Sequence, residues 1–165
     1  MLLAAVTACA LAPATASAAL PRPASTAIVP GRSIGGVSIG MSARRALAAW
    51  GPGGHCTAPS GRRSCTWLGA RLQGTASFDV GAGGTVRSIV IAAGHNERSL
   101  VYKGPLMKWK TGAGVHLGVT AAAVYKAYPQ ARRSASGPQI GVGPRSTIFA
   151  QSPRRISRIY IGPPF

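Results

Sequence analysis

The sequence has almost no acidic side chains. Asp79 and Glu97 are its only carboxylates among 165 residues, whereas Lys and Arg number nineteen, and the formal net charge is +17. Two carboxylates cannot pair with nineteen cations, so most of the cations must lie in water or contact an external polyanion. The scarcity also limits general acid–base catalysis, because that chemistry needs a positioned pair of groups with separated proton affinities.

Nucleotide-binding motifs are also missing. The chain contains no GxxxxGK[ST] loop and no GxGxxG ahead of a βαβ unit. The sequence therefore predicts no cofactor, no metal ion and no enzyme activity. One catalytic alternative stays open, a small hydrolase centred on His95 and Glu97 in the segment GHNER.

No apolar run is long enough for a transmembrane anchor, because Pro13 interrupts the apolar N-terminal stretch. That stretch has the length of a signal-peptide core, and Ala16-Ser17-Ala18 has the small-x-small pattern of a cleavage site. We expect residues 1–18 to be a signal peptide and the protein to be secreted. The alternative is a lipoprotein attached to the cell membrane through Cys9, since Val6-Thr7-Ala8-Cys9 also fits a lipidation box.

Cysteine is scarce as well. If Cys9 leaves with the signal peptide or carries a lipid, only Cys56 and Cys65 remain. In an oxidising compartment, two cysteines around a short segment are expected to form a disulfide. A metal site built from His55 and the two cysteines is the alternative, but no fourth ligand lies nearby and the spacing fits no common zinc pattern.

Two segments of the chain share one pattern. Residues 36–51 read GVSIGMSARRALAAWG, and residues 114–129 read GVHLGVTAAAVYKAYP. In each, glycines form a turn, Ser42 or Thr120 occupies an N-cap position, and apolar residues follow with helical spacing. The matched positions keep their physical role more often than their identity, which is typical of a structural repeat.

Strand-like segments follow each predicted helix. In the first half they are residues 65–68, 71–80 and 85–91, with a hairpin loop at 81–84, and in the second half they are residues 139–142, 147–151 and 155–161. Alternation puts Ile89, Ile91, Ile159 and Ile161 toward the helices. On the opposite face it puts Ser88, Val90, Arg158 and Tyr160.

The expected fold is therefore α+β, with two tandem repeats that each pack a short helix, or a pair of helices, on a small antiparallel sheet. The predicted organisation is a signal peptide at 1–18, a Pro- and Ala-rich linker at 19–33, repeat one at 34–92, a connector at 93–113 and repeat two at 114–161.

The two repeated segments and the pair Cys56 and Cys65 resemble the tandem repeat of the β-lactamase inhibitor protein family and of related secreted actinobacterial proteins. More distantly they resemble the BamE/SmpA outer-membrane lipoproteins, which share a "hydrophobic-x-hydrophobic-Gly-Met-Ser/Thr" start to a helix packed on a small sheet. The resemblance covers residues 34–161. It implies a helix-on-sheet fold and, as a function, inhibition of a secreted enzyme.

The residues themselves favour a non-catalytic binding module. From residue 101 onward the chain has ten cations and no carboxylate, and such a surface attracts anionic polymers in a salt-dependent way. The expected partner is an anionic envelope polymer, a phospholipid headgroup or an acidic protein, with nucleic acid possible but not favoured. A solvated basic surface without a dedicated partner stays open. The predicted binding residues are Lys108, Trp109, Lys110, Arg158 and Tyr160.

Overall fold

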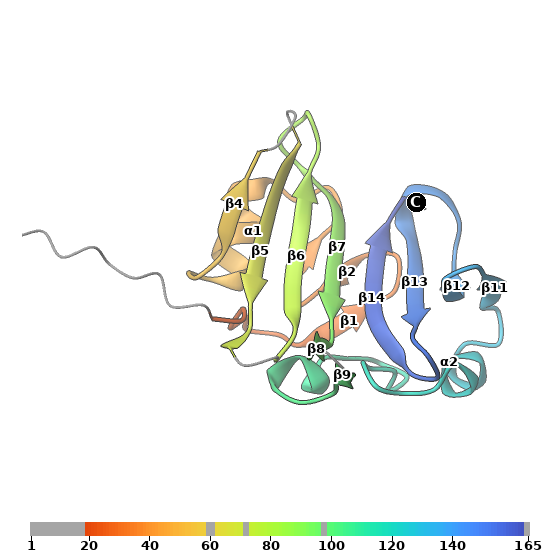
Figure 1. Ribbon diagram of the computed structural model, residues 1–165. Coiled ribbons are helices and arrows are strands. Elements are labelled where there is room, and N and C mark those ends of the chain that lie inside the picture. The colour runs from red at the N-terminus through yellow and green to blue at the C-terminus, as the bar shows by residue number, and fades with distance from the viewer. Residues whose placement is uncertain (1–18, 59–61, 71–72, 97–98, 164–165) are drawn as a thin grey trace, which may run out of the picture.

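The computed structural model describes residues 19–58, 62–70, 73–96 and 99–163 (Figure 1). The predicted signal peptide with Cys9 lies outside the described residues, and so does Glu97. Of the described residues, 43% are in strands and 17% are in helices. The protein is therefore mainly β.

The largest element is an eight-stranded sheet in which neighbouring strands are antiparallel. From one edge to the other its strands are β11 (Arg132–Ser134), β12 (Gly137–Ile140), β13 (Ser146–Gln151), β14 (Ile156–Gly162), β7 (Val86–Ala92), β6 (Thr75–Val80), β5 (Arg63–Leu68) and β4 (His55–Thr57). Strands β4 to β7 form one half and β11 to β14 the other. The halves join where β7 pairs with β14.

A second layer covers one face of this sheet. It contains helix α1 (Ala43–Trp50) and a four-stranded sheet of β10 (Lys110–Thr111), β1 (Ala27–Val29), β2 (Ser33–Ile34) and β3 (Val37–Ser38). Both lie behind the large sheet in Figure 1. Helix α2 (Ala121–Ala127) contacts β12 and β13. The remaining elements are the hairpin β8 (Gly94–His95) and β9 (Leu100–Val101), and the 3-10 helices η3 (Pro105–Lys108) and η4 (Gly143–Arg145).

The core lies between the two layers, and strand alternation explains which side chains enter it. Ile159 pairs with Ile91 and Ile161 pairs with Ile89, and all four are fully buried. Phe78 of β6 continues this row from beside Ile89. The predicted inward positions are confirmed, because a period of two sends every second residue of a strand to the same face.

Trp50 is the centre of an aromatic cluster in this core. Its ring lies edge-on to Trp67, Phe78 and Trp109, at centroid distances of 5.1, 5.6 and 6.0 Å. Its indole nitrogen also donates to the carbonyl oxygen of Gly35 at 3.1 Å. Edge-to-face pairs of this kind contribute about 0.5–1.5 kcal/mol each beyond the area they bury. The cluster joins α1, the large sheet and the segment before β10.

The expected α+β fold of two helix-on-sheet repeats is wrong. The structure has a single large antiparallel sheet, and the described residues contain only two α-helices, of eight and seven residues. Both segments with helical spacing do form helices, but two helices of about two turns each are too short to make a helical layer on their own. The sequence pattern does not predict β1, β2 and β10, because strands of two or three residues hold too few alternations to detect.

The two predicted helix starts differ in their capping. Thr120 is the N-cap of α2, and its hydroxyl oxygen accepts a hydrogen bond from the amide of Ala123 at 3.3 Å. Ser42 occupies the N-cap position of α1 with an extended backbone, but its side chain makes no capping bond. Helix α1 ends at Gly51, whose φ of 76° favours glycine because side chains rarely tolerate that conformation.

The segments expected to be a linker and a connector belong to the fold. Within residues 19–33, Ile28 of β1 is 1% exposed, and β1 pairs in parallel with β10 of the connector. Leu106 of η3 is also fully buried. The Pro- and Ala-rich composition of residues 19–33 predicts irregular structure, but single large apolar residues in the two segments suffice to fix them to the core.

The predicted disulfide is confirmed. Cys56 of β4 and Cys65 of β5 face each other in the sheet register, with an S–S distance of 2.05 Å. Both sulfurs are therefore engaged, which removes the alternative metal site with His55. The bond attaches the short edge strand β4 to its only neighbour in the sheet.

Replacing both cysteines by alanine is expected to lower the free energy of unfolding by about 2–3 kcal/mol, because the bond closes a short loop in the unfolded chain. Urea denaturation followed by circular dichroism measures the loss. The wild-type protein in reductant is the control and should show a similar loss. A double variant as stable as the oxidised protein would contradict this role for the bond.

Candidate binding face of the large sheet

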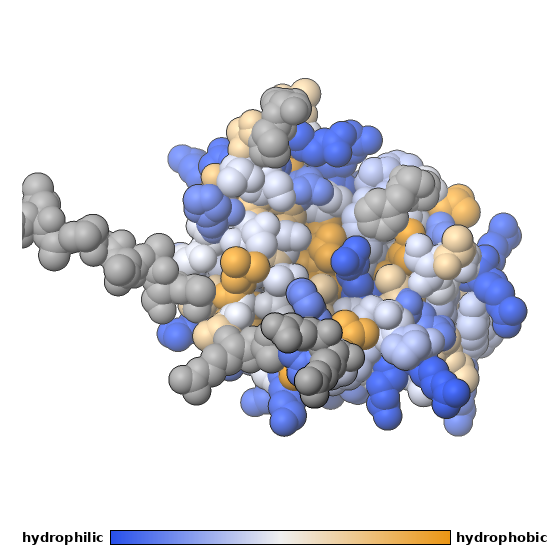
Figure 2. Space-filling view, viewed as in Figure 1, coloured by the Kyte–Doolittle hydropathy of each residue, from blue (hydrophilic) through white to orange (hydrophobic). Residues whose placement is uncertain are grey.

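One face of the large sheet has no described helix or strand packed across its centre. We call it the open face. On its inner strands it consists of Ser64, Thr66, Leu68, Thr75, Ser77, Asp79, Ser88, Val90, Ala92, Ile148, Ala150, Arg158 and Tyr160. Figure 2 looks onto this face and shows mostly weakly polar and apolar surface in the middle, interrupted by a small hydrophilic area, with hydrophilic side chains around most of the rim.

Two of the five predicted binding residues lie on the open face. Arg158 and Tyr160 are alternate residues of β14, paired with Ala92 and Val90 of β7. Arg158 is exposed, and no hydrogen bond or ion pair engages its guanidinium group within the part of the chain that the structure describes. Its charge is therefore available to a partner.

Tyr160 is a buried structural residue and not an exposed binding residue. Its side chain is 5% exposed, and its hydroxyl donates to the carbonyl oxygen of Pro163 at 2.6 Å. Burial, and after it the negative charge of Asp79, raises the pKa of Tyr160, while a hydrogen bond with Ser88 and the charge of Arg87 oppose the shift. The hydroxyl thus stays protonated as a donor.

The expected basic and aromatic surface at Lys108, Trp109 and Lys110 does not form. Trp109 is 2% exposed and its indole lies in the core against Trp50, so it cannot stack on a partner. Lys108 and Lys110 are exposed, but Lys110 belongs to β10 in the covering layer. The five predicted residues do not make a single site, since Lys110 and Arg158 lie in different sheets.

A groove of about 440 Å³ lies at one end of the open face. Its floor is formed by neighbouring strands of the large sheet and carries Thr75, Ala92, Ala150 and Arg158. Three of these four side chains are small, which leaves room above the strands. Arg158 is the only cation among the described residues that line it.

The groove has two walls. Leu68, at the end of β5, forms one wall and is 53% exposed, which is unusual for a large apolar side chain. The β8–β9 hairpin forms the other wall through His95 and Leu100, which pair with each other across the hairpin. The groove therefore combines apolar walls with one unpaired guanidinium group and one imidazole.

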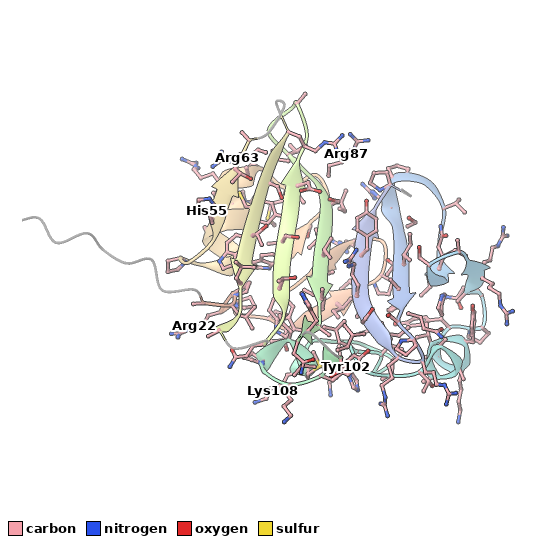
Figure 3. The ribbon with its side chains drawn as sticks, viewed as in Figure 1. Arg22, His55, Arg63, Arg87, Tyr102 and Lys108 are labelled. Atoms are coloured by element: carbon pink, nitrogen blue, oxygen red, sulfur yellow. A yellow bond between two sulfur atoms is a disulfide. The ribbon has the colours of Figure 1, made fainter. Side chains whose placement is uncertain are left out.

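Cations are distributed around the molecule. Every Lys and Arg among the described residues is exposed. Arg63 and Arg87 lie at one end of the sheet strands in Figure 3, and Lys108 lies beyond the other end. The only described carboxylate side chain, Asp79, accepts a hydrogen bond from the hydroxyl of Ser88 at 2.7 Å. The open face is therefore uncharged over most of its area, with Asp79 and Arg158 inside it and further cations near its two ends.

The described residues bring no carboxylate to His95. Asp79 is hydrogen-bonded to Ser88 and does not line the groove, and Glu97, the proposed partner of His95, lies outside the described residues. Across the described ranges, no group of three His, Cys, Asp or Glu residues is placed to hold a metal ion. In the same ranges, no helix has both the length and the apolar character needed to span a membrane.

Sequence reasoning found Arg158 but missed the groove. Leu68, His95 and Ala150 come from three separate parts of the chain, and only the sheet order brings them together. The sequence contains one relevant signal, because the alternation along residues 155–161 predicts that Arg158 faces away from the core.

The chain matches no known protein-family model, no curated protein and no solved structure. Its function must therefore be inferred from its own geometry.

Proposed function

We propose that the protein is an exported, non-catalytic binding module whose open face engages an anionic partner in the cell envelope or outside the cell. The observation that carries this proposal is Arg158, an exposed cation on an uncovered sheet face whose guanidinium group has no partner among the described residues. A guanidinium group on a rigid strand needs little reorganisation to bind a carboxylate or phosphate.

The charge distribution supports the same partner class. With a net charge of +17 and every described cation exposed, the protein attracts polyanions over distances comparable to the Debye length. The signal-peptide pattern at residues 1–18 supports export, and so does the disulfide, because such bonds persist in oxidising compartments.

Titration against teichoic acid, anionic vesicles and an acidic protein tests this function. We expect binding to at least one of them that weakens as salt rises, because counterions are released and charges are screened. Arg158→Gln should weaken that binding about tenfold, the effect of losing one charge-assisted hydrogen bond.

Arg45→Gln is the matched control, because it removes the same charge from the exposed surface of α1, in the layer behind the sheet. Its effect should be less than that of Arg158→Gln. Equal effects of the two variants would mean that the net charge, and not the open face, attracts the partner. Absence of salt-sensitive binding to all three probes would refute the proposed function.

A second candidate function is inhibition of a secreted enzyme. The open face supports it, because a wide surface of small side chains on a fixed sheet lets another protein approach closely. Inhibition assays against secreted β-lactamases and peptidases test this candidate. A panel without inhibition would remove it and leave the anionic partner unaffected.

A further inference from the structure

We infer that the groove between Leu68 and the β8–β9 hairpin is a binding site for a small amphiphilic carboxylate, meaning a monocarboxylate on a short apolar chain or ring. This ligand differs from the macromolecular partner proposed above, and the site does not require that partner. The two share Arg158, so a bound carboxylate would compete with an anionic partner for the same guanidinium group.

The charges that line the groove select a monoanion. Among the described residues that line the groove, Arg158 is the only cation and none is a carboxylate. Its guanidinium group is free of internal partners among the described residues. One planar fork of donors matches one carboxylate in a bidentate pair, whereas a phosphate dianion would leave charge uncompensated. The ring nitrogens of His95 offer a second hydrogen-bonding group on the opposite wall.

The walls select an apolar body. Leu68 is 53% exposed and Leu100 is half-buried, and both face the same groove. Covering such surface is favourable by about 25 cal/mol per Å² of apolar area removed from water. A sugar-phosphate or polyol-phosphate polymer has no apolar group to place there. An aliphatic or aromatic acid has both parts in one molecule.

The floor determines the size and stiffness of the site. A volume of about 440 Å³ falls within the range of small-molecule pockets. Ala92 and Ala150 flank Arg158 on neighbouring strands, and the amide of Ala93 donates to the carbonyl oxygen of Ser157 at 2.8 Å. Strand-borne side chains hold their positions more closely than side chains on loops, so the ligand enters a preformed site.

Two-dimensional amide NMR of the full protein tests the inference, with hexanoate and phenylpropionate as probes. We expect saturable shifts of groove resonances, including those of Leu68, Ala92 and Leu100. Acetate has the charge without the apolar body, and hexanamide has the body without the charge. Each control should bind at least about tenfold more weakly, the ratio that one charge-assisted hydrogen bond or one buried side chain contributes.

Two variants locate the ligand. Arg158→Gln should weaken hexanoate binding about tenfold, and Ala92→Leu should abolish it by filling the floor while keeping the charge. Arg87→Gln is the matched control, because it removes the same charge from an exposed position outside the groove, and it should leave binding unchanged.

Three results would overturn the inference: no saturable shifts, shifts remote from the groove, or equal loss in Arg158→Gln and Arg87→Gln. None of these results tests the proposed function, which is measured separately as salt-dependent binding to polyanions. A protein that binds hexanoate but no polyanion would retain this site and lose the proposed function. A protein that binds a polyanion but not hexanoate would retain the proposed function and lose this site.

Discussion

Replacing Trp109 by alanine is expected to lower the free energy of unfolding by about 3–5 kcal/mol, the usual cost of removing a buried large aromatic side chain. The indole is 2% exposed and lies edge-on to Trp50 at 6.0 Å. Gly35 lies so close that a Cβ there would be 2.5 Å from Cζ3 of Trp109. We therefore expect the backbone around Trp109 to leave a cavity in the alanine variant instead of closing into it.

The neighbouring lysines are the matched controls for this substitution. Lys108→Ala and Lys110→Ala remove exposed side chains on either side of Trp109 and should change stability by less than about 0.5 kcal/mol. Urea denaturation followed by far-ultraviolet circular dichroism compares the three variants without relying on tryptophan fluorescence. If the lysine variants lost as much stability as Trp109→Ala, the burial of the indole would not explain the effect.

Gly74→Ala is expected to destabilise the protein by about 2–5 kcal/mol, from a disfavoured backbone conformation and a steric overlap. Gly74 has a φ of 100°, which side chains rarely adopt, and a Cβ there would overlap the carbonyl oxygen of Ala92. Ala92 is the last residue of β7 and pairs with Thr75 of β6 and Arg158 of β14, so its backbone cannot move without disturbing these pairings.

Gly83→Ala is the control for Gly74→Ala. Gly83 lies in the turn between β6 and β7, where a Cβ would meet nothing within 4 Å. This change should be neutral or slightly stabilising, because alanine restricts the unfolded chain more than glycine does. Thermal unfolding of the two variants measures the difference. Similar midpoints for both would contradict the steric argument at Gly74.

Local signals predicted the parts of the fold that have local causes. The spacing of Ala46 and Trp50 indicated α1, and the alternation of Ile89 with Ile91 placed the core face of β7, because both patterns reside in adjacent residues. The pair Cys56 and Cys65 was recognised from its spacing and compartment. These three predictions agree with the structure.

The remaining features depend on contacts between distant residues. Trp109 between two lysines has the pattern of a nucleic-acid or polyanion site, but the turn of η3 directs it inward while the lysines stay in water. Nothing in the segment from Lys108 to Lys110 encodes that direction. The groove is a similar case. Leu68 and Arg158 line the same groove only because β5, β6, β7 and β14 pair side by side in the large sheet.

The parallel pairing of β1 with β10 has a consequence for the kinetics of folding. Ala27 pairs with Lys110. During synthesis, which starts at the N-terminus, β1 therefore lacks one of its partner strands until β10 has left the ribosome. Closing long loops before they gain contacts slows folding. The joining of β7 to β14 imposes the same delay on the large sheet. We therefore expect one slow, cooperative folding step that involves both ends of the chain.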